Sequence, residues 1–522
     1  MKAIFVLFDS LMRPALGCYG FDHVKTPNFD RFSRRAVTFD THFVGSLPCM
    51  PARRDIHSGR LNFLHRSWGP LEPFDNSFPE VMREGKIHTH LVTDHLHYFE
   101  DGGSTYHGRF RTYDFIRGQE YDPWKAMVQP PLERFREKYS SKHYDLSDGC
   151  EFRNWKKMQH AINCEFMPEE KDFPLTRCFD SAFEFLKYND RADNWFMMLE
   201  CFDPHEPFHA PQRFKEPYQT GWNGGILDWP YYEMVNNSKA EIAEIRANYA
   251  ALLSACDHYF GKLLAHFDRN NLWEDTALIL STDHGFLLGE HDWWGKNLQP
   301  YYTEISHIPL IVHHPRFRAY AGARRRAVTQ TMDLMPTLLD IFDLPVPVEV
   351  QGRSLVPLLR EDKPVRDIAI FGMFGGPIGA TDGRYAYYLY PKDLYAPGLY
   401  EYTLMPMHLH TLFTAAEMKT AKLRQPFDFT KEMPVMQIDA LMDARRIPIH
   451  DNKKFEPGVG TTLFDLASDP KQEKPFRDEA IERRFHIGMA CVMRAHDTPA
   501  EIYGRYGIDP SLADAREDAS AR

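Results

Sequence analysis

The sequence predicts an α/β fold in which a large, mostly parallel central sheet is covered by helices and followed by a smaller C-terminal α+β subdomain. Three apolar runs have the length and composition of strands that are buried on both faces. They span residues 3–8, 195–202 and 276–282. Amphipathic segments alternate with these runs, as is typical of a sheet packed between helices. They span residues 28–36, 179–188 and 239–267.

The pattern changes after about residue 380. Aromatic residues at 385–390 follow a turn, and residues 463–466 form another short strand pattern. We therefore predict a catalytic α/β domain at residues 1–380 and a smaller subdomain with a short antiparallel sheet at residues 381–522. The tail from about residue 509 is predicted to form a surface helix.

The composition limits the classes of function. A chain of 522 residues with 43% hydrophobic residues can bury a large core. Its formal net charge of -11 argues against binding to nucleic acid or anionic lipid, since both are polyanions. The apolar N-terminal residues reach Asp9 too early for a signal peptide, and no run approaches the length of a membrane span. We expect a cytoplasmic protein with no nucleic-acid or membrane partner, and a homo-oligomer stays open.

The eight cysteines are scattered without CxxC pairs, which favours reduced thiols over a zinc ribbon or a disulfide scaffold. Cys49 alone has polar, turn-rich neighbours. Pro51 suits the first turn of a helix that runs to about Ser58 and ends at Gly59. Cys49 would then lie at the positive end of the helix dipole, where anions bind. Arg53 can supply a forked donor to a sulfate or phosphate oxyanion.

Each of the three apolar runs is followed by an acidic residue, and two of these acids have a histidine nearby. These residues are Asp9, Asp203, His205, Asp283 and His284. Ligands of doubly wound sheets bind outside the carboxyl ends of the strands. The sequence therefore predicts a polar site at this edge of the sheet.

The chain resembles the type I sulfatases of the alkaline phosphatase superfamily, whose signature is C-x-P-x-R followed by Gly-Arg. Cys49, Pro51 and Arg53 match the signature, and Gly59 and Arg60 complete it. Further segments match the family, in the family's order along the chain, at residues 9–20, 204–207, 282–296 and 463–470. The resemblance implies an alkaline-phosphatase-like sandwich and a sulfuric ester hydrolase that acts on aryl or carbohydrate sulfate monoesters.

The resemblance also implies that a formylglycine-generating maturation enzyme converts Cys49 to formylglycine, whose hydrated aldehyde is the nucleophile. One geminal hydroxyl attacks sulfur and displaces the alcohol. The second hydroxyl then loses its proton and expels sulfate, which regenerates the aldehyde. A divalent cation would lower the pKa of the attacking hydroxyl and offset charge on the sulfate oxygens.

The metal ligands implied by the resemblance are Asp9, Asp283, His284 and modified Cys49. Many sulfatases carry a second acid or amide directly after the first Asp, where this chain has Ser10, and they often carry Asn in place of His284. We expect calcium, while manganese and magnesium also suit this donor set.

Two further residues match positions that handle the sulfate and the leaving group. By resemblance, Lys296 binds a sulfate oxygen and His205 donates a proton to the leaving oxygen, a role suited to an imidazole. Many sulfatases place a Gly-Lys-x-His after the strand of this region, whereas this chain has residues 93–97 there, with Asp94 where a lysine is expected. We expect His97 to line the pocket, with His95 as the second choice.

Two other functions stay open. Phosphonate monoester and phosphodiester hydrolases of the same superfamily share the modified Cys and a metal set that resembles Asp9, Asp283 and His284. A catalytically silent relative that binds anionic sugars is the second alternative. The sequence does not identify the alcohol part of the substrate.

Overall fold

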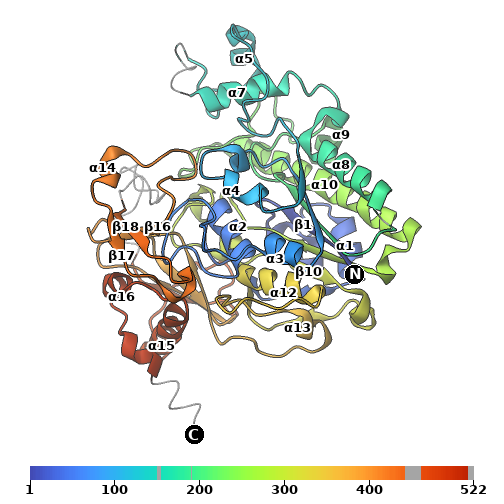
Figure 1. Cartoon of the computed structure of the whole chain (residues 1–522). Helices are drawn as coiled ribbons and strands as arrows, with labels where there is room; N and C mark the ends of the chain where they lie inside the picture. The colour runs from blue at the N-terminus through green and yellow to red at the C-terminus, as the bar shows by residue number, and fades with distance from the viewer. Residues whose placement is uncertain (148, 150–153, 190, 441–459, 515–522) are drawn as a thin grey trace.

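The fold is built on a sheet of eight strands (Figure 1). The structure is a computed structural model that describes residues 1–147, 149, 154–189, 191–440 and 460–514. In spatial order the strands are β11 (Arg324–Arg325), β2 (Val37–Phe39), β10 (Leu310–His313), β7 (Thr276–Ser281), β1 (Lys2–Phe8), β6 (Trp195–Cys201), β4 (His88–Thr93) and β5 (Thr112–Phe115). The three apolar runs are therefore confirmed as strands β1, β6 and β7, and β1 lies between the other two.

The register of the three central strands brings their carboxyl ends to one level. Strand β1 is parallel to both neighbours, and Leu7 pairs with Glu200 of β6 and Ser281 of β7. Asp9 and Asp283 each follow two residues after the paired Leu7 and Ser281, so they emerge at the same edge. Strand β10 is antiparallel to β7, which makes the sheet mixed.

Helices cover both faces of the sheet, which explains why the central strands are apolar throughout. One face packs its side chains, Val6 and Phe8 among them, in one core with side chains of α8 and α10. The other face packs Phe5 and Leu7 in one core with side chains of α2, α3 and α12. The helices are α8 (Pro174–Asn189), α10 (Lys239–Asn270), α2 (Cys49–Ser58), α3 (Phe78–Glu84) and α12 (Leu334–Ile341). The predicted helices at 179–188 and 239–267 thus lie within α8 and α10, and α1 (Pro27–Ser33) accounts for the third.

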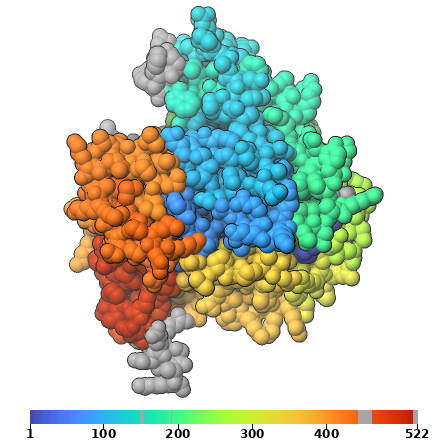
Figure 2. Space-filling model, viewed as in Figure 1, coloured from blue at the N-terminus to red at the C-terminus, as the bar shows by residue number. Residues whose placement is uncertain are grey.

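The C-terminal part contains a four-stranded antiparallel sheet and lies alongside the N-terminal body (Figure 2). Its strands are β13 (Ala369–Gly372), β14 (Ile378–Thr381), β15 (Tyr385–Leu389) and β19 (Thr462–Asp465). A second antiparallel sheet joins β16 (Tyr400–Thr403), β18 (Val435–Asp439) and β17 (Lys422–Arg424). The smaller C-terminal sheet region is confirmed, while a domain division at residue 380 stays a prediction because β13 already begins at Ala369.

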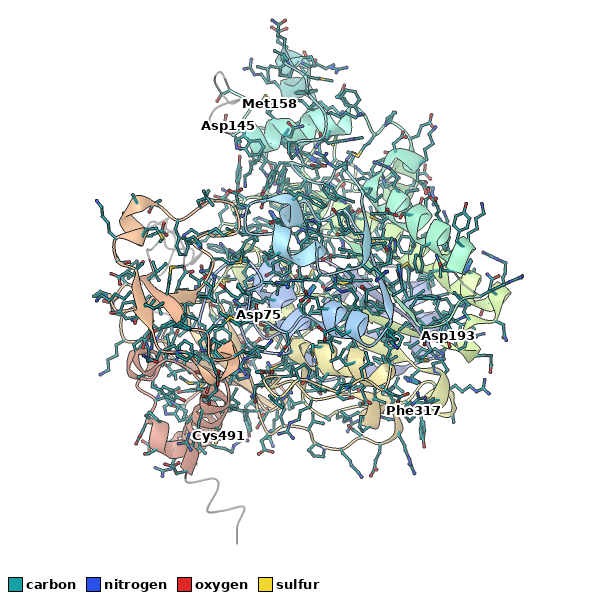
Figure 3. All side chains as sticks on the ribbon, viewed as in Figure 1. Asp75, Asp145, Met158, Asp193, Phe317 and Cys491 are labelled. Atoms are coloured by element: carbon teal, nitrogen blue, oxygen red, sulfur yellow. The ribbon has the colours of Figure 1, made fainter. Side chains whose placement is uncertain are left out.

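Helices α15 (Glu479–Ala495) and α16 (Ala500–Tyr506) pack their apolar side chains in one core with side chains of the four-stranded sheet. The predicted tail helix is a short 3-10 turn at Pro510–Ala513, and residues 515–522 lie outside the described part. The cysteines of the described ranges form no disulfide bonds with one another, and one of them, Cys491, lies on α15 in the C-terminal part (Figure 3). No helix in the described ranges has the length and apolar character needed to cross a membrane.

Candidate active site

Four side chains gather where strands β1 and β7 end against the start of helix α2. Asp9, Cys49, Asp283 and His284 each offer a ligand atom, and these atoms all lie within 4.8 Å of one another. All four are buried. Nε2 of His284 lies 3.2 Å from the Cys49 sulfur and 3.4 Å from Oδ2 of Asp283. Such spacings suit atoms that share one cation, because metal–ligand distances are shorter than the distances between ligands.

Helix α2 fixes the position of Cys49. The helix begins at Cys49 with Pro51 in its first turn, and it ends at Gly59, whose φ of 68° suits glycine. The predicted helix is therefore confirmed. Burial, followed by the negative charge of Asp9, raises the pKa of the Cys49 thiol well above its ordinary value. Desolvation therefore outweighs the effect of the helix dipole on this thiol.

Arg53, one turn further along α2, donates hydrogen bonds from its guanidinium to three carboxylates. Its Nη2 donates to Asp9 at 2.9 Å, Nη1 to Asp283 at 2.6 Å, and Nε to Glu200 at 2.6 Å. All four side chains are fully buried. Arg53 thus orients two of the predicted metal ligands, which differs from the expectation that it contacts the oxyanion directly.

Glu200 is a site residue that sequence reasoning missed. It lies in β6, where Oε1 accepts from Arg53, and the hydroxyls of Thr93 and Tyr98 donate to its carboxylate at 3.2 and 3.3 Å. The available signal was a single acid inside an otherwise apolar strand. Because a buried carboxylate needs a partner, such an acid indicates a buried cation nearby.

Lys296 approaches the cluster from strand β9 (Trp294–Gly295). Its Nζ lies 3.2 Å from the Cys49 sulfur, 3.5 Å from Oγ of Ser10 and 3.9 Å from Oδ1 of Asp9. Burial opposes the charge, but the surrounding groups, Cys49 first, raise the pKa of Lys296 above its ordinary value. The lysine is therefore a buried, permanently charged ammonium at the predicted nucleophile.

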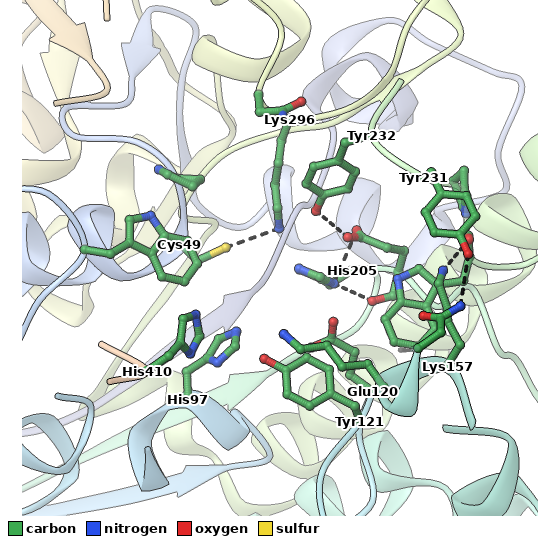
Figure 4. Close-up of a pocket in the computed structure, with 18 of the residues that line it drawn as sticks. Cys49, His97, Glu120, Tyr121, Lys157, His205, Tyr231, Tyr232, Lys296 and His410 are labelled. Carbon is green, nitrogen blue, oxygen red and sulfur yellow. Dashed lines mark hydrogen bonds and ion pairs between the residues drawn. The ribbon is translucent and has the colours of Figure 1, made fainter. Parts of the chain in front are cut away.

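His205 lies in the loop after β6, with its ring at the cavity beside Cys49 and Lys296 (Figure 4). Its Nδ1 is 2.5 Å from the carbonyl oxygen of Glu206 and 3.3 Å from Oε2 of the same residue. A carbonyl oxygen can only accept, so Nδ1 carries the hydrogen. Burial, followed by the charge of Lys296, lowers the pKa of His205 well below its ordinary value, so the imidazole is neutral.

Two positions where the chain departs from the sulfatase pattern have structural roles. Ser10 adopts a left-handed φ of 59°, donates its hydroxyl to Asp9 at 2.7 Å and its backbone N–H to Asp283 at 3.1 Å. Asp94 accepts from the backbone of Phe202 at 2.7 Å and from Gln119 at 3.3 Å. The carboxylate of Asp94 is therefore occupied by the protein and joins β4 to the end of β6.

The two histidines after β4 have different surroundings. His95 is fully buried, its Nε2 lies 3.8 Å from Oδ2 of Asp9, and neither of its ring nitrogens has a hydrogen-bond partner among the described residues. A buried imidazole without a partner indicates a polar group that completes the site. His97 lines the cavity.

Glu100 joins His97 to a distant part of the chain. Oε2 of Glu100 lies 2.7 Å from Nδ1 of His97 and 2.5 Å from Nδ1 of His410. These three residues also have ligand atoms close enough to hold a metal. Distances of this length are hydrogen bonds, however, and they are shorter than the spacing in the Asp9 cluster. Sequence reasoning missed His410, which comes from a loop more than three hundred residues away.

Cys49 connects the cluster to a cavity of about 380 Å³. Cys49, Lys296 and His205 line it together with aromatic side chains, two further lysines and two glutamates. The cavity therefore offers a charged end for an anion and a mixed aromatic and polar region for the remainder of a ligand.

Known proteins resemble the chain over most of its length. The Sulfatase family profile matches residues 2–344, and the profile of the C-terminal part of N-sulphoglucosamine sulphohydrolase matches residues 289–425. A multifunctional alkaline phosphatase superfamily protein of Trinickia caryophylli is 26% identical over 378 residues, which cover 65% of this chain and 72% of the relative. An arylsulfatase of Clostridium perfringens is 22% identical over 384 residues, which cover 69% and 78%.

The same fold occurs in a solved structure. The crystal structure of the phosphonate monoester hydrolase of Agrobacterium radiobacter superposes with a TM-score of 0.62 at 17% identity, covering 96% of this chain and 97% of that protein. The family match spans more than half of the chain and includes the strand ends, helix α2 and Lys296. The chain therefore belongs to the sulfatase family, a family of sulfuric ester hydrolases within the alkaline phosphatase superfamily.

Proposed function

We propose that the protein hydrolyses sulfate monoesters of an aryl or carbohydrate alcohol, with formylglycine derived from Cys49 and one divalent cation. The observation that carries this proposal is the buried group of Asp9, Cys49, Asp283 and His284, with the ammonium of Lys296 3.2 Å from the Cys49 sulfur. The two carboxylates, the imidazole and the ammonium surround the sulfur of Cys49. Such groups can bind a cation and stabilise the charge that develops during transfer of a sulfuryl group.

The residues at this site fit a divalent cation. Asp9, Asp283, His284 and an oxygen on modified residue 49 would hold it, and the unpartnered imidazole of His95 leaves a further polar group beside Asp9. Carboxylate oxygens favour a hard cation, which supports calcium, and the imidazole also admits manganese or magnesium. When bound, the cation lowers the pKa of the attacking hydroxyl and offsets charge on the sulfate oxygens.

The sulfur of Cys49 marks where an oxygen of the modified residue would lie, since Lys296 and His284 both approach it at 3.2 Å. The hydrated aldehyde supplies two hydroxyls, one to attack sulfur and one to release sulfate. Burial raises the pKa of the thiol, so an unmodified Cys49 would be a poor nucleophile. The partner that performs the modification would be a formylglycine-generating enzyme.

The charged residues around the cluster have separate roles in this proposal. Arg53 holds Asp9 and Asp283 in place, so their oxygens point to the cation. Lys296 holds a sulfate oxygen and opposes the negative charge that develops on it.

His205 would protonate the leaving oxygen. Its Nδ1–H is held by the carbonyl of Glu206, so a proton for the leaving group has to come from Nε2. In the free protein the imidazole is neutral, because burial and Lys296 lower its pKa. A bound sulfate ester brings a negative charge that favours the imidazolium, and the histidine then becomes an acid.

A second candidate function is hydrolysis of phosphonate monoesters or phosphodiesters. It is compatible with one observation: Asp94, in the region where many sulfatases place a lysine, accepts hydrogen bonds from Phe202 and Gln119 and adds no positive charge to the site. A phosphodiester carries a single negative charge, as a sulfate monoester does, so the site can accept either.

Side-by-side kinetics test the assignment. The matured protein would be assayed with an aryl sulfate, an aryl phosphodiester and an aryl phosphonate monoester of the same phenol, after mass spectrometry of the peptide that contains residue 49. We expect an aldehyde at this position and the largest kcat/KM for the sulfate. A preference for either phosphorus ester by orders of magnitude would assign the second function instead. The free cysteines of the described part support a reducing compartment such as the cytoplasm.

A further inference from the structure

We propose that the cavity contains a subsite for an ammonium group carried by the alcohol part of the ester, formed by the carboxyl groups of Glu120 and Glu206 between aromatic walls. This inference rests on the proposed function only in taking the cavity beside Cys49 as the place where the ester binds. It adds a substrate class: sulfate esters of cationic amino alcohols or amino sugars.

The two carboxyl groups have few hydrogen-bond donors on the cavity side. Both residues line the cavity, and they are only 8% and 2% exposed. Within the part of the chain that the structure describes, Oε2 of Glu120 and Oε2 of Glu206 are buried and accept no hydrogen bond, although Nδ1 of His205 lies 3.3 Å from Oε2 of Glu206. Oε1 of Glu206 is occupied by the hydroxyl of Tyr232. Buried carboxyl oxygens normally have donors, so this pair indicates a ligand that supplies them.

The charge of the pair points to a cation. Burial, followed by the charge of Glu206, raises the pKa of Glu120 to about 8, and burial also raises the pKa of Glu206. Burial first, and then the repulsion between the two carboxylates, favours a proton on the pair, while the charges of Lys156 and Lys296 oppose it. A ligand ammonium would take over the role of that proton and satisfy both unpartnered oxygens.

Glu120 lines the cavity with its backbone in an unfavourable conformation. Glu120 has a φ of 45°, in the left-handed region that is unfavourable for a residue with a side chain. Its carbonyl accepts from Nδ1 of His160 at 3.2 Å and from Nδ2 of Asn163 at 3.5 Å. Such a conformation is unfavourable and recurs at functional sites.

The walls of this region suit a cation as well. Tyr121, Trp229, Tyr231 and Tyr232 line the cavity. Aromatic faces attract ammonium groups, including quaternary ones that cannot donate hydrogen bonds. Two of these rings already have a lysine ammonium over them in the structure, at 4.0 Å for Tyr121 and 3.9 Å for Trp229.

The two lysines of the cavity wall suggest the opposite ligand, a second anion, and their contacts argue against it. Lys157 is buried, and its Nζ donates to the carbonyl oxygen of Trp229 at 2.7 Å. Burial lowers the pKa of Lys157 to about 7, so its charge is only partial at neutral pH. Nζ of Lys156 lies over the ring of Tyr121. A second anion near these lysines would also face the two glutamates.

Matched substrate pairs test the subsite. The first pair is choline sulfate and its neutral isostere 3,3-dimethylbutyl sulfate, and the second is glucosamine 6-sulfate and N-acetylglucosamine 6-sulfate. We expect the cationic member of at least one pair to have a kcat/KM at least about tenfold higher. The pair with the larger ratio distinguishes a quaternary ammonium alcohol from an amino sugar.

The same ratios in Glu120→Gln, which keeps the shape and removes the charge, should fall toward one. Glu206→Gln should act in the same direction, and Glu84→Gln, an exposed residue of α3, should leave the ratios unchanged. Circular dichroism and Tm of each variant identify any loss of folding, and either glutamate variant alone suffices. Equal rates within both pairs, an unchanged ratio in both glutamate variants, or a preference for disulfated esters would overturn the proposal.

Binding measurements separate this inference from the proposed function. Calorimetric titration of Cys49→Ala protein with choline and with glucosamine needs neither maturation nor turnover. We expect binding at least about tenfold tighter than that of 3,3-dimethylbutanol or N-acetylglucosamine, and its loss in the Cys49→Ala, Glu120→Gln double variant. Such binding in a protein that hydrolyses no sulfate ester would support the subsite while the proposed function fails. Sulfate hydrolysis without selectivity in either assay would do the reverse.

Discussion

Nζ of Lys296 lies 3.2 Å from the sulfur of Cys49, although the two residues come from opposite ends of the catalytic region. The contact brings a fixed positive charge to the atom that we propose is modified. Gly295, directly before the lysine, has a φ of 112°, and a Cβ at this position would lie 2.6 Å from the ring of Tyr232. Gly295 therefore sets both the approach of Lys296 and the packing of the cavity wall.

Replacing Lys296 should impair catalysis more than folding. Lys296→Met removes the buried charge but keeps much of the side-chain volume, so we expect kcat/KM for an aryl sulfate to fall by about 100-fold or more. Lys187→Met, at an exposed position of α8, is the matched control. A rate for Lys296→Met within threefold of the control would show that this charge does not act on the sulfate.

Cys49→Ala should abolish turnover and leave the fold intact. The thiol is small, and its loss removes the modified residue entirely, so we expect at least about a 1,000-fold loss in kcat. The Tm should change by only a few degrees, since the cavity left by one sulfur is small. Cys491→Ala, at a partly buried cysteine of α15, should keep full activity. Turnover by Cys49→Ala comparable with the wild type would refute the mechanism.

Arg53 and Glu200 should show strong coupling in stability. Arg53→Met leaves three buried carboxylates without their cation, and we expect the free energy of unfolding to fall by about 3–5 kcal/mol. The double variant Arg53→Met, Glu200→Gln should recover part of this loss, because one of the unpaired charges is gone. Urea unfolding of the wild type, of each single variant and of the double variant measures the coupling. Strictly additive losses would mean that the Arg53–Glu200 pair contributes little.

The effect of His205→Ala should depend on the leaving group. An alkyl alkoxide needs a proton when it departs and a nitrophenolate does not, so the loss in kcat/KM should be much larger for alkyl sulfates. A series of aryl sulfates with phenols of different pKa would give a steeper dependence on leaving-group pKa in the variant. Parallel lines for wild type and variant would argue against a proton donor.

Glu120→Gln should stabilise the free protein at alkaline pH. The folded-state pKa of Glu120, about 8, lies above its ordinary value of 4.5. The stability that its neutral form provides is therefore complete below pH 4.5 and is lost as the pH rises through 8. At about 1.4 kcal/mol for each pKa unit, the wild type should be a few kcal/mol less stable than the variant at pH 9.

Unfolding curves between pH 5 and pH 9 would measure this difference between Glu120→Gln and the wild type. Glu84→Gln serves again as the control, since an exposed glutamate should show no such trend. A difference in stability that does not grow with pH would mean that Glu120 is ionised in the folded protein.

Much of the fold and the centre of the site could be predicted because local signals carry them. The central strands are continuous apolar runs, and the acids that follow them mark the ligand edge of the sheet. Helix α2 was recognisable from Pro51 and Gly59, whose backbone preferences are specific. These features depend on residues close together in the sequence.

The remainder of the site depends on contacts that no local pattern encodes. Arg53 resembles an anion-binding residue in sequence, and only the register of β6 against β1 and β4 reveals Glu200 beside it. His410 reaches Glu100 from a loop of the C-terminal part. The low pKa of His205 follows from burial and from Lys296, so it could not be read from the histidine alone.

For the modification that we propose, the burial of Cys49 also determines an order of events during synthesis. The residue is only 2% exposed, and Pro51 and Arg53 are enclosed with it, so no enzyme could grasp this segment in the folded protein. Oxidation of the thiol would have to happen while the chain is still unfolded, so it would compete with folding. A molecule that folds before oxidation would keep its thiol. The active fraction of a preparation would then depend on the relative rates of oxidation and folding, and not on the stability of the folded protein.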